Sequence, residues 1–341
     1  MSTLILGYQD VRRALSPPAC AEAMSTVLAA GARGEAHNSL RSVMLVDGAR
    51  GFMGLMPAWG AGRSADSPGA WTGGNSAGSP GTFGLKALCL IPDNPTRGLD
   101  THQGTVTLFD GETGLPRAIL NASAVTEIRT AAVTAVATRA LARKDARALA
   151  ILGAGVQARS HLEALTAAHE FDRITLYAPT AAHAEGVARD FGGGLTVCAG
   201  AREAVEGADV VVTVTSAREP VLERTWLAVG AHVNAVGAST PHSRELDVQT
   251  VADCALFCDS RESLRHEAGE FRLAVEQGAI AGIEHVRAEL GEVLDGQRPG
   301  RRDARELTVF RSLGIGIEDL AAAQVAVGAA RRLGLGVELT L

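Results

Sequence analysis

A glycine-rich turn in the middle of the chain carries the clearest chemical signal. An apolar run, residues 146–152, ends at Gly153-Ala154-Gly155-Val156-Gln157-Ala158, and a helical pattern follows at once. In such G-x-G-x-x-A turns the first glycine makes the tight turn, the second admits a pyrophosphate, and the small third residue lets helix and strand pack closely. The helix N-terminus adds free N–H groups for the anion. The turn predicts a dinucleotide site, although similar turns occur without nucleotides.

The end of the next predicted strand bears on which dinucleotide binds. In this fold an acidic residue there usually binds the adenosine ribose hydroxyls of NAD. Here the strand ends Leu176-Tyr177-Ala178-Pro179-Thr180, without an acid and without an Arg or Lys beside Thr180. The missing acid removes a barrier to NADP, and the Thr180 hydroxyl can donate to a 2′-phosphate. We expect NADP or NAD as the cofactor, with a slight preference for NADP.

The cysteines give little reason to expect a metal. The chain has five, scattered through apolar contexts, which is typical of buried thiols in a reducing cytoplasm. Cys254 and Cys258 have a spacing that a metal pair would use, but they lie in a predicted buried strand and no second Cys or His pair follows. We therefore predict no metal site.

Composition places the chain among two-domain α/β proteins. Its 341 residues suit two domains of ordinary size, and 46% are hydrophobic while only 4% are aromatic, so Ala, Val and Leu must build the core. A net charge of −6 with no basic run argues against nucleic acid or an anionic membrane as partner. No apolar stretch would span a bilayer, and the N-terminus lacks a signal-peptide pattern. We expect a cytoplasmic protein.

The elements that must position the chemistry begin with a helix and antiparallel strands. Ser16 before two prolines is a start signal for a helix over 19–30. Asp47-Gly48 and residues 110–114 are hairpin turn sequences. Residues 60–82, rich in Gly, Ser, Ala and Pro, read either as a surface insertion or as a lid over substrate. The predicted strands here are 42–46, 51–56, 83–91, 106–109 and 116–120.

From residue 124 the pattern changes to strands alternating with helices. A helix is predicted over 124–141, and a last helix over 312–330 is expected to return to the first domain. Such alternation is typical of βαβ units and a parallel sheet. We predict an α/β fold, with a Rossmann-type doubly wound parallel sheet and a second, discontinuous α+β domain. The strands predicted for the parallel sheet are 147–152, 173–178, 195–198, 209–214, 232–236 and 254–258.

Further strings occur in an order shared with a known family. They are Met56-Pro57-Ala58, Gly84-Leu85-Lys86, Pro92-Asp93-Asn94-Pro95 through Gly98, Thr101-His102-Gln103-Gly104, Arg129-Thr130-Ala131-Ala132, the glycine-rich turn and the run from Val309 to Leu320. Over nearly its whole length the chain resembles the ornithine cyclodeaminase/mu-crystallin family. The resemblance implies a Rossmann domain, 129–311, and a substrate-binding and dimerisation domain, 1–128 plus 312–341. It also implies hydride exchange between a nicotinamide and the Cα of an amino or imino acid.

Three cationic residues match positions that hold the substrate carboxylate in the family. They are Arg41 before a predicted strand, Lys86 within a strand, and Arg129 early in the helix over 124–141. A lysine among apolar neighbours is costly unless it meets a partner or an anion, and an arginine can grip a carboxylate with two parallel hydrogen bonds. Without the motifs, Lys86 reads as an edge-strand residue and Arg129 as a surface charge. Lys86 is also a candidate catalytic proton donor, because burial lowers the pKa of a lysine.

A serine at the end of the fifth predicted strand separates two activities within the family. The cyclodeaminases carry an Asp at the position of Ser239, where it handles protons, whereas Ser resembles the ketimine reductases. Serine is no general base near neutral pH without help; the alternative is that Ser239 is only a turn residue. The fold and the resemblance together place these residues at the cofactor: Thr130, Gly153, Ala154, Gly155, Val156, Gln157, Thr180, Thr215, Ser216, Val236, Gly237, Ser239, Ser312 and Leu313.

These observations favour an NAD(P)H-dependent reductase of imino acids, either a ketimine reductase or an amino-acid dehydrogenase, acting in amino-acid metabolism as a homodimer. One alternative is a cyclodeaminase, a lyase that uses NAD+ catalytically. Another is a non-catalytic, crystallin-like protein that binds the nucleotide. Substrate side-chain specificity is expected to depend on residues around Met53 and Leu55 and on the 60–82 insertion.

Overall fold

The chain divides into two compact units. The structure, a computed structural model, describes residues 2–61 and 80–340. Unit 1 comprises Met1–Arg129 and Gly314–Leu341, and unit 2 comprises Thr130–Leu313. Helix α3 (Ala122–Leu141) begins in unit 1 and continues into unit 2. Two boundary residues lie in different units from those predicted. Arg129, predicted in the nucleotide-binding domain, belongs to unit 1, where it pairs with Asp319. Leu313, predicted in the substrate-binding domain, belongs to unit 2, where its amide donates to Asp259.

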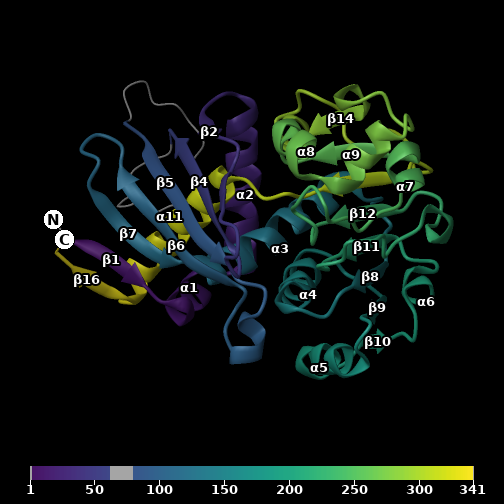
Figure 1. Cartoon of the computed structure of the whole chain (residues 1–341), viewed down its shortest axis with the longest axis horizontal. Helices are drawn as coiled ribbons and strands as arrows, with labels where there is room; N and C mark the ends of the chain where they lie inside the picture. Colours follow the sequence, from purple (N-terminus) through teal and green to yellow (C-terminus); the bar gives the residue numbers. More distant parts are fainter. Residues whose placement is uncertain (1, 62–79, 341) are drawn as a thin grey trace. The chain divides into compact units, whose positions relative to one another are not determined.

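Unit 1 is built on a mostly antiparallel sheet with strand order β16-β1-β7-β6-β5-β4-β2, and with β3 paired to β4 (Figure 1). The predicted hairpins are confirmed, since β3 pairs with β4 and β6 with β7, both antiparallel. The elements of unit 1, with α3, are β1 (Thr3–Leu6), α1 (Tyr8–Ala14), α2 (Pro17–Ala32), β2 (Ala36–Asn38), β3 (Ser42–Leu45), β4 (Phe52–Gly60), β5 (Thr82–Leu90), a 3-10 turn (Asn94–Arg97), β6 (His102–Asp110), β7 (Pro116–Asn121), α11 (Gly316–Leu333) and β16 (Val337–Leu339).

Helix α11 covers one face of this sheet. It runs behind β4 to β6 in the view of Figure 1, and its Leu320 approaches Gly84 so closely that a Cβ there would lie 3.0 Å from the leucine side chain. Because side chains alternate along a strand, Lys86 shares that covered face. Lys86 therefore lies in an interior strand between β4 and β6, and the edge-strand interpretation is wrong.

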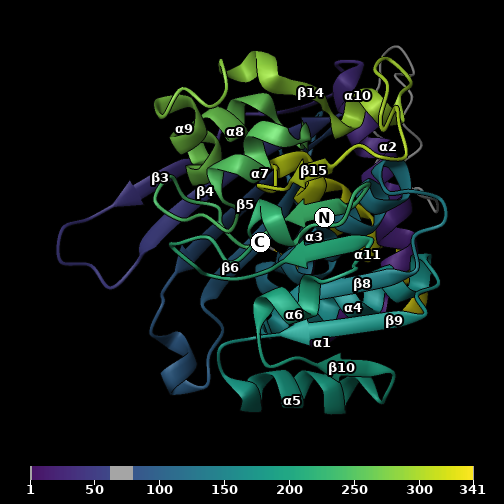
Figure 2. The same ribbon diagram turned by 90° about the vertical axis from the view of Figure 1, so that its right-hand side faces the viewer.

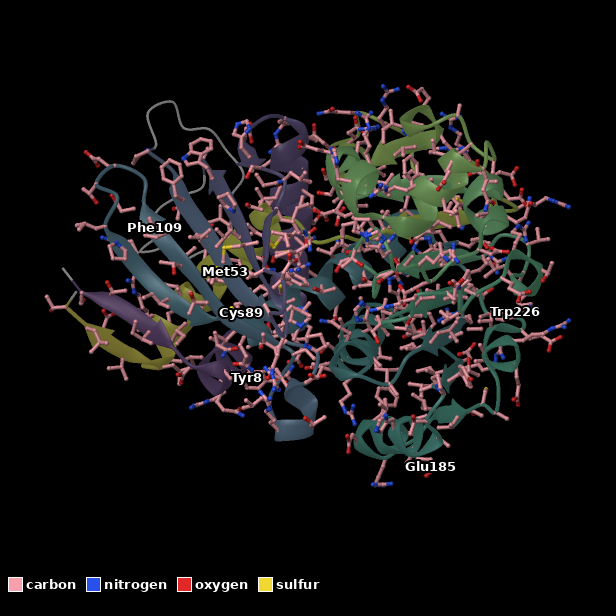
Figure 3. All side chains as sticks on the ribbon, in the orientation of Figure 1. Tyr8, Met53, Cys89, Phe109, Glu185 and Trp226 are labelled. Atoms are coloured by element: carbon pink, nitrogen blue, oxygen red, sulfur yellow. The ribbon has the colours of Figure 1, made fainter. Side chains whose placement is uncertain are left out.

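The opposite face of the sheet is apolar and open. Figure 3 shows the labelled side chains of Met53, Cys89 and Phe109 on this face, and Phe83 is 50% exposed there. Met53 and Leu55 alternate with Met56, which pairs across from Lys86, so they point away from that lysine. Met56, next to them in the sequence, lies on the same face as Lys86, and the dependence of substrate specificity on residues around Met53 and Leu55 stays a prediction. We name the set Met53, Phe83, Cys89 and Phe109 the outer apolar face.

Three expectations for unit 1 need adjustment. Strands β1 and β16 close the sheet but were not predicted, because each is only three or four residues long. The last helix begins at Gly316 rather than at residue 312, because Gly314 has φ +76° and Ile315 is extended, so neither can belong to the helix. The 60–82 insertion falls mostly on residues 62–79, which lie outside the described residues. Within the described chain, no helix combines the length and apolarity needed to cross a bilayer.

Unit 2 contains an all-parallel sheet of eight strands, in the order β10-β9-β8-β11-β12-β15-β13-β14. The six predicted strands are present, but β14 and β15 were missed, because β14 alternates apolar with charged residues and β15 is short. The elements are β8 (Ala148–Leu152), α4 (Val156–Ala168), β9 (Arg173–Tyr177), α5 (Ala181–Phe191), β10 (Leu195–Val197), α6 (Ala201–Val205), β11 (Val210–Thr213), β12 (His232–Ala235), α7 (Val248–Asp253), β13 (Ala255–Cys258), α8 (Arg261–Glu267), α9 (Gly269–Glu276), β14 (Val286–Glu289), α10 (Leu290–Leu294) and β15 (Thr308–Arg311), with 3-10 turns at Arg224–Trp226 and Ile283–His285.

The strand order creates a switch point beside β8. The chain leaves β8 for β9 on one side and returns to β11 on the other, and Figure 2 shows β8 and β9 running in the same direction. Ligands of open α/β sheets bind at the carboxyl ends of the strands at such a point. The glycine-rich turn lies there, because it follows Leu152 at the end of β8.

Candidate active site

The glycine-rich turn has the backbone geometry that a phosphate site requires. Gly153 has φ +122°, and a Cβ at Gly153 would lie 2.5 Å from the Val214 carbonyl oxygen, so only glycine fits. Gly155 is the extended N-cap residue of α4, and nothing lies within 4 Å of the place where its Cβ would be. The turn thus leaves open space at the N-terminus of a 13-residue helix. This geometry fits an anion held by backbone N–H groups.

Two buried side-chain atoms of residues predicted to bind the cofactor have no hydrogen-bond partner among the residues that the structure describes. They are Thr130 Oγ1 on α3 and Gln157 Oε1 in the first turn of α4. Buried polar groups in folded proteins are nearly always paired, so an unpaired one needs an explanation. Both residues were predicted to contact the cofactor. A bound dinucleotide would supply the missing partners, and the residues present therefore fit such a group.

A buried carboxylate that the sequence analysis missed holds the neighbouring loops. Glu245, fully buried, accepts hydrogen bonds from the amides of Thr215 (2.6 Å) and Gly237 (2.7 Å), and from the hydroxyl of Thr213 (2.9 Å). A further bond comes from the Thr215 hydroxyl at 2.8 Å. Glu245 therefore fixes the loops that follow β11 and β12. An acidic residue in an unpatterned loop gave no sequence signal for this role.

The remaining predicted cofactor residues occupy the ends of the same strands. Ser216 is exposed beyond β11, Val236 is buried directly after β12, and Ser312 is buried after β15. Ser239 lies in the partly exposed loop after β12, and its hydroxyl makes no hydrogen bond to another residue of the described chain.

An arginine lies beside the glycine-rich turn. Arg159 of α4 pairs with Asp190 of α5 at 2.9 Å, and its Nη1 lies 3.5 Å from the carbonyl oxygen of Ala154 in the turn. Asp190 belongs to the last turn of α5, whereas Thr180 is the N-cap residue of that helix, and the Thr180 side chain makes no capping hydrogen bond. The local sequence around Thr180 gave no sign of this guanidinium, because Arg159 belongs to the helix before β9.

In unit 1 the predicted carboxylate-binding residues meet around one acidic residue. Lys86 Nζ lies 2.7 Å from Asp319 Oδ2, and Arg129 Nε lies 3.0 Å from Asp319 Oδ1. The Lys86 and Asp319 side chains are 2% and 1% exposed. Arg129 also reaches Glu318 at 2.9 Å. Two of the three predicted cations are thus brought together in the interior of unit 1.

Arg41 joins this cluster through the start of the last segment. It donates to the carbonyl oxygen of Gly314 at 3.1 Å, and a Cβ on Gly314 would lie 2.6 Å from the Nη atoms of Arg129. Gly314 has φ +76°, so both its conformation and its contacts require glycine. Contrary to expectation, Arg41 follows strands β1 and β2 rather than preceding the first strand. We name Lys86, Arg129, Arg41, Asp319 and Glu318 the charged cluster.

Burial and neighbouring charges shift the pKa values of three residues in and beside the charged cluster. Burial lowers the pKa of Lys86 to about 8, with Asp319 opposing the shift and Arg129 adding to it. Burial alone would raise the pKa of Asp319, but the charges of Lys86 and Arg129 hold it below its ordinary value. His102 on β6 is neutral near pH 7, because burial and then the charge of Lys86 lower its pKa to about 4. Lys86 can therefore exchange a proton near neutral pH.

Asp319 and Glu318 lie in the run from Val309 to Leu320 that resembles the family, but they were not predicted as site residues. Their only local signal is that two acids occupy the first turn of a helix, which commonly serves the helix dipole. Here they face the interior, since both are at most 1% exposed. The structure identifies Asp319 and Glu318 as site residues because both are buried in the first turn of α11 and contact the predicted cations.

The comparison with known proteins assigns the chain to a family. The profile of the ornithine cyclodeaminase/mu-crystallin family matches residues 1–332. The chain belongs to this family. It is 36% identical to the ketimine reductase mu-crystallin of Macropus fuliginosus, over 95% of this chain and 96% of that protein.

Two solved structures of the family have closely similar folds. One is the Δ1-pyrroline-2-carboxylate reductase of Thermococcus litoralis in complex with NADH and L-proline, with a TM-score of 0.88, 31% identity, and coverage of 99% of this chain and 100% of that one. The other is an archaeal alanine dehydrogenase dimer with bound NAD, with a TM-score of 0.89, 31% identity and full coverage of both chains. The predicted family and fold class are confirmed.

Proposed function

We propose that this protein is an NAD(P)H-dependent reductase of small imino acids. The observation that carries the proposal is the charged cluster, in which Lys86, Arg129 and Arg41 converge inside a domain attached to a Rossmann unit. Burying several cations close together costs folding free energy unless an anion binds among them. A substrate carboxylate is such an anion, and the relatives named above act on amino or imino acids.

The chain's residues have distinct tasks in this reaction. Arg129, Arg41 and Lys86 would bind the substrate carboxylate and thereby orient the C=N bond. Bound coenzyme would supply the hydride for the imine carbon. Lys86, poised by burial, would supply the proton for nitrogen when it is not already protonated. Arg129 and Thr130 are consecutive residues of α3, so the helix links the carboxylate-binding residues directly to a residue predicted to contact the cofactor.

The substrate is either a cyclic ketimine or an imine formed from a 2-oxo acid and an amine. The Thermococcus litoralis relative, crystallised with NADH and L-proline, favours the cyclic case, and the archaeal alanine dehydrogenase favours the open-chain case. Ser239 argues against a cyclodeaminase, because its hydroxyl cannot replace a carboxylate as base. A purely nucleotide-binding role would leave the charged cluster without a purpose.

We further propose that the outer apolar face of unit 1 forms a homodimer. Met53 is 37% exposed and Phe83 is 50% exposed, and strand β3 beside them is exposed throughout. Contiguous apolar surface of this kind marks an interaction site, and a two-fold dimer buries the same patch on both copies. The dimeric alanine dehydrogenase relative supports this arrangement. A cytoplasmic location suits the five free cysteines.

The test is a substrate panel with both coenzymes. NADPH and NADH oxidation would be followed with Δ1-pyrroline-2-carboxylate, with its six-membered homologue, and with pyruvate plus ammonia or methylamine. We expect at least one imine to be reduced with stoichiometric coenzyme oxidation. Ornithine with NAD+ is run in parallel. Release of ammonia from ornithine with no net reduction of NAD+ would refute the proposal and identify the protein as a cyclodeaminase.

A further inference from the structure

Asp319 occupies the centre of the charged cluster. Each of its carboxylate oxygens faces a different cation, Oδ2 to Lys86 at 2.7 Å and Oδ1 to Arg129 at 3.0 Å. Lys86 has one other hydrogen-bond partner, the Thr126 hydroxyl at 3.4 Å, which is long. Asp319 is therefore the one close anionic partner of Lys86 among the contacts of the described residues.

Two further titratable groups lie close enough to the charged cluster to interact with it, and both are uncharged near pH 7. His102 on β6 is neutral because its pKa is lowered, and Cys20 on α2 is a neutral thiol because burial raises its pKa.

We propose that Asp319 is a positioning residue that holds Lys86 as an ammonium ion inside the protein, through the 2.7 Å contact between its Oδ2 and Lys86 Nζ. Without a counter-charge, an ammonium that is 2% exposed releases its proton rather than stay charged in an apolar strand. Arg129 and Arg41 increase that tendency, since they are cations close to it. Asp319 alone opposes it at contact distance.

Asp319 also fixes where Lys86 points. Helix α11 carries Asp319 over the face of β5, and the acid ties the end of the flexible lysine chain to the Arg129 guanidinium. Of the two other N–H groups of the Lys86 ammonium, one makes the long hydrogen bond to Thr126, which leaves one for substrate. The inference rests on the proposed function only for its catalytic consequence, because the charge state of Lys86 is a property of the protein alone.

The chain permits a direct measurement, because it contains two lysines, Lys86 and Lys144. Lys144 is exposed. Full-length protein grown with lysine labelled with 13C at Cε gives one signal for each, and Lys144→Arg assigns them. Titration of the chemical shift then reports the pKa of Lys86 without any turnover. In the wild type we expect Lys86 to titrate with a pKa near 8.

The decisive variant is Asp319→Asn, which keeps the shape and removes the charge. We expect the pKa of Lys86 to fall by at least about one unit, the usual effect of losing an opposite charge at contact distance. Asp319→Glu retains the charge and is expected to leave Lys86 titrating close to the wild type, which also covers the case in which Asp319→Asn folds poorly. Glu318→Gln is the matched control, since Glu318 pairs with Arg129; its effect on Lys86 should be smaller.

An unchanged pKa of Lys86 in Asp319→Asn would overturn the inference, as would an equal shift in Glu318→Gln. For the enzyme, the inference predicts that the alkaline fall of kcat/KM moves to lower pH in Asp319→Asn, with activity partly recovered in acid. A merely structural role would lower kcat/KM equally at every pH. If no imine is reduced at all, the proposed function fails while the titration still decides the role of Asp319.

Discussion

Replacing Lys86 with methionine separates substrate binding from cofactor binding. Methionine is unbranched and of similar length, so it fills the space of a side chain that is 2% exposed. Asp319 keeps its contact with Arg129 at 3.0 Å, so the variant does not strand a buried carboxylate. We therefore expect Lys86→Met to fold and to keep its affinity for NAD(P)H, because the glycine-rich turn and Glu245 belong to unit 2.

The size of the expected loss follows from the two tasks of Lys86. A hydrogen bond to a charged group contributes about 1.5–3 kcal/mol, so losing one from the substrate carboxylate raises KM by about 10- to 100-fold. Loss of a positioned proton donor lowers kcat by about 10²- to 10⁴-fold. Together the two effects predict a fall in kcat/KM of about 10³- to 10⁶-fold.

Steady-state kinetics with the best imine of the panel, together with coenzyme binding followed by fluorescence, tests this prediction. Lys144→Met is the matched control, since it removes the other lysine from an exposed position and should leave kcat/KM unchanged. Normal turnover by Lys86→Met would refute the assignment of Lys86. A loss of coenzyme binding equal to the loss of activity would show instead that the substitution disturbs the whole fold.

Three further predictions address the cofactor site and the assembly. Gly153→Ala would place a Cβ 2.5 Å from the Val214 carbonyl oxygen at φ +122°, so coenzyme affinity should fall at least about tenfold; equilibrium binding that matches the wild type would contradict this. Arg159→Gln should raise KM for NADPH by about 10-fold, roughly one charge-assisted hydrogen bond, with little change for NADH; equal effects on both coenzymes would assign Arg159 to the Asp190 pair alone. If the proposed homodimer forms through the outer apolar face, Phe83→Asp should lower the mass in light scattering to that of a monomer, and an unchanged dimer mass would place the interface elsewhere.

The features predicted from sequence are those that local patterns determine. The glycine-rich turn is encoded within six consecutive residues, and the structure gives Gly153 the backbone conformation that the motif implies. The hairpins and the six strands followed from turn residues and apolar runs for the same reason. Lys86 and Arg129 were found through family strings, since neither composition nor periodicity separates a buried cation from a surface one.

The features that were missed depend on contacts between distant segments. The acid that completes the cluster, Asp319, is 190 residues from Arg129, and only the passage of α11 across the sheet brings them together. Arg159 was missed because its position beside the turn depends on the packing of α4 against α5. The face on which Met53 and Leu55 lie could not be predicted, because pairing with β5 fixes the register of their strand.

The central claim is that hydride passes between the coenzyme and the Cα of an imino acid. The most direct test supplies NADPH or NADH deuterated at nicotinamide C4 on the transferred side, with Δ1-pyrroline-2-carboxylate as substrate, and analyses the product by mass spectrometry and NMR. The account predicts proline that carries deuterium at Cα, formed in proportion to the coenzyme oxidised. Reduced product without deuterium at Cα, from coenzyme labelled on either side, would contradict it.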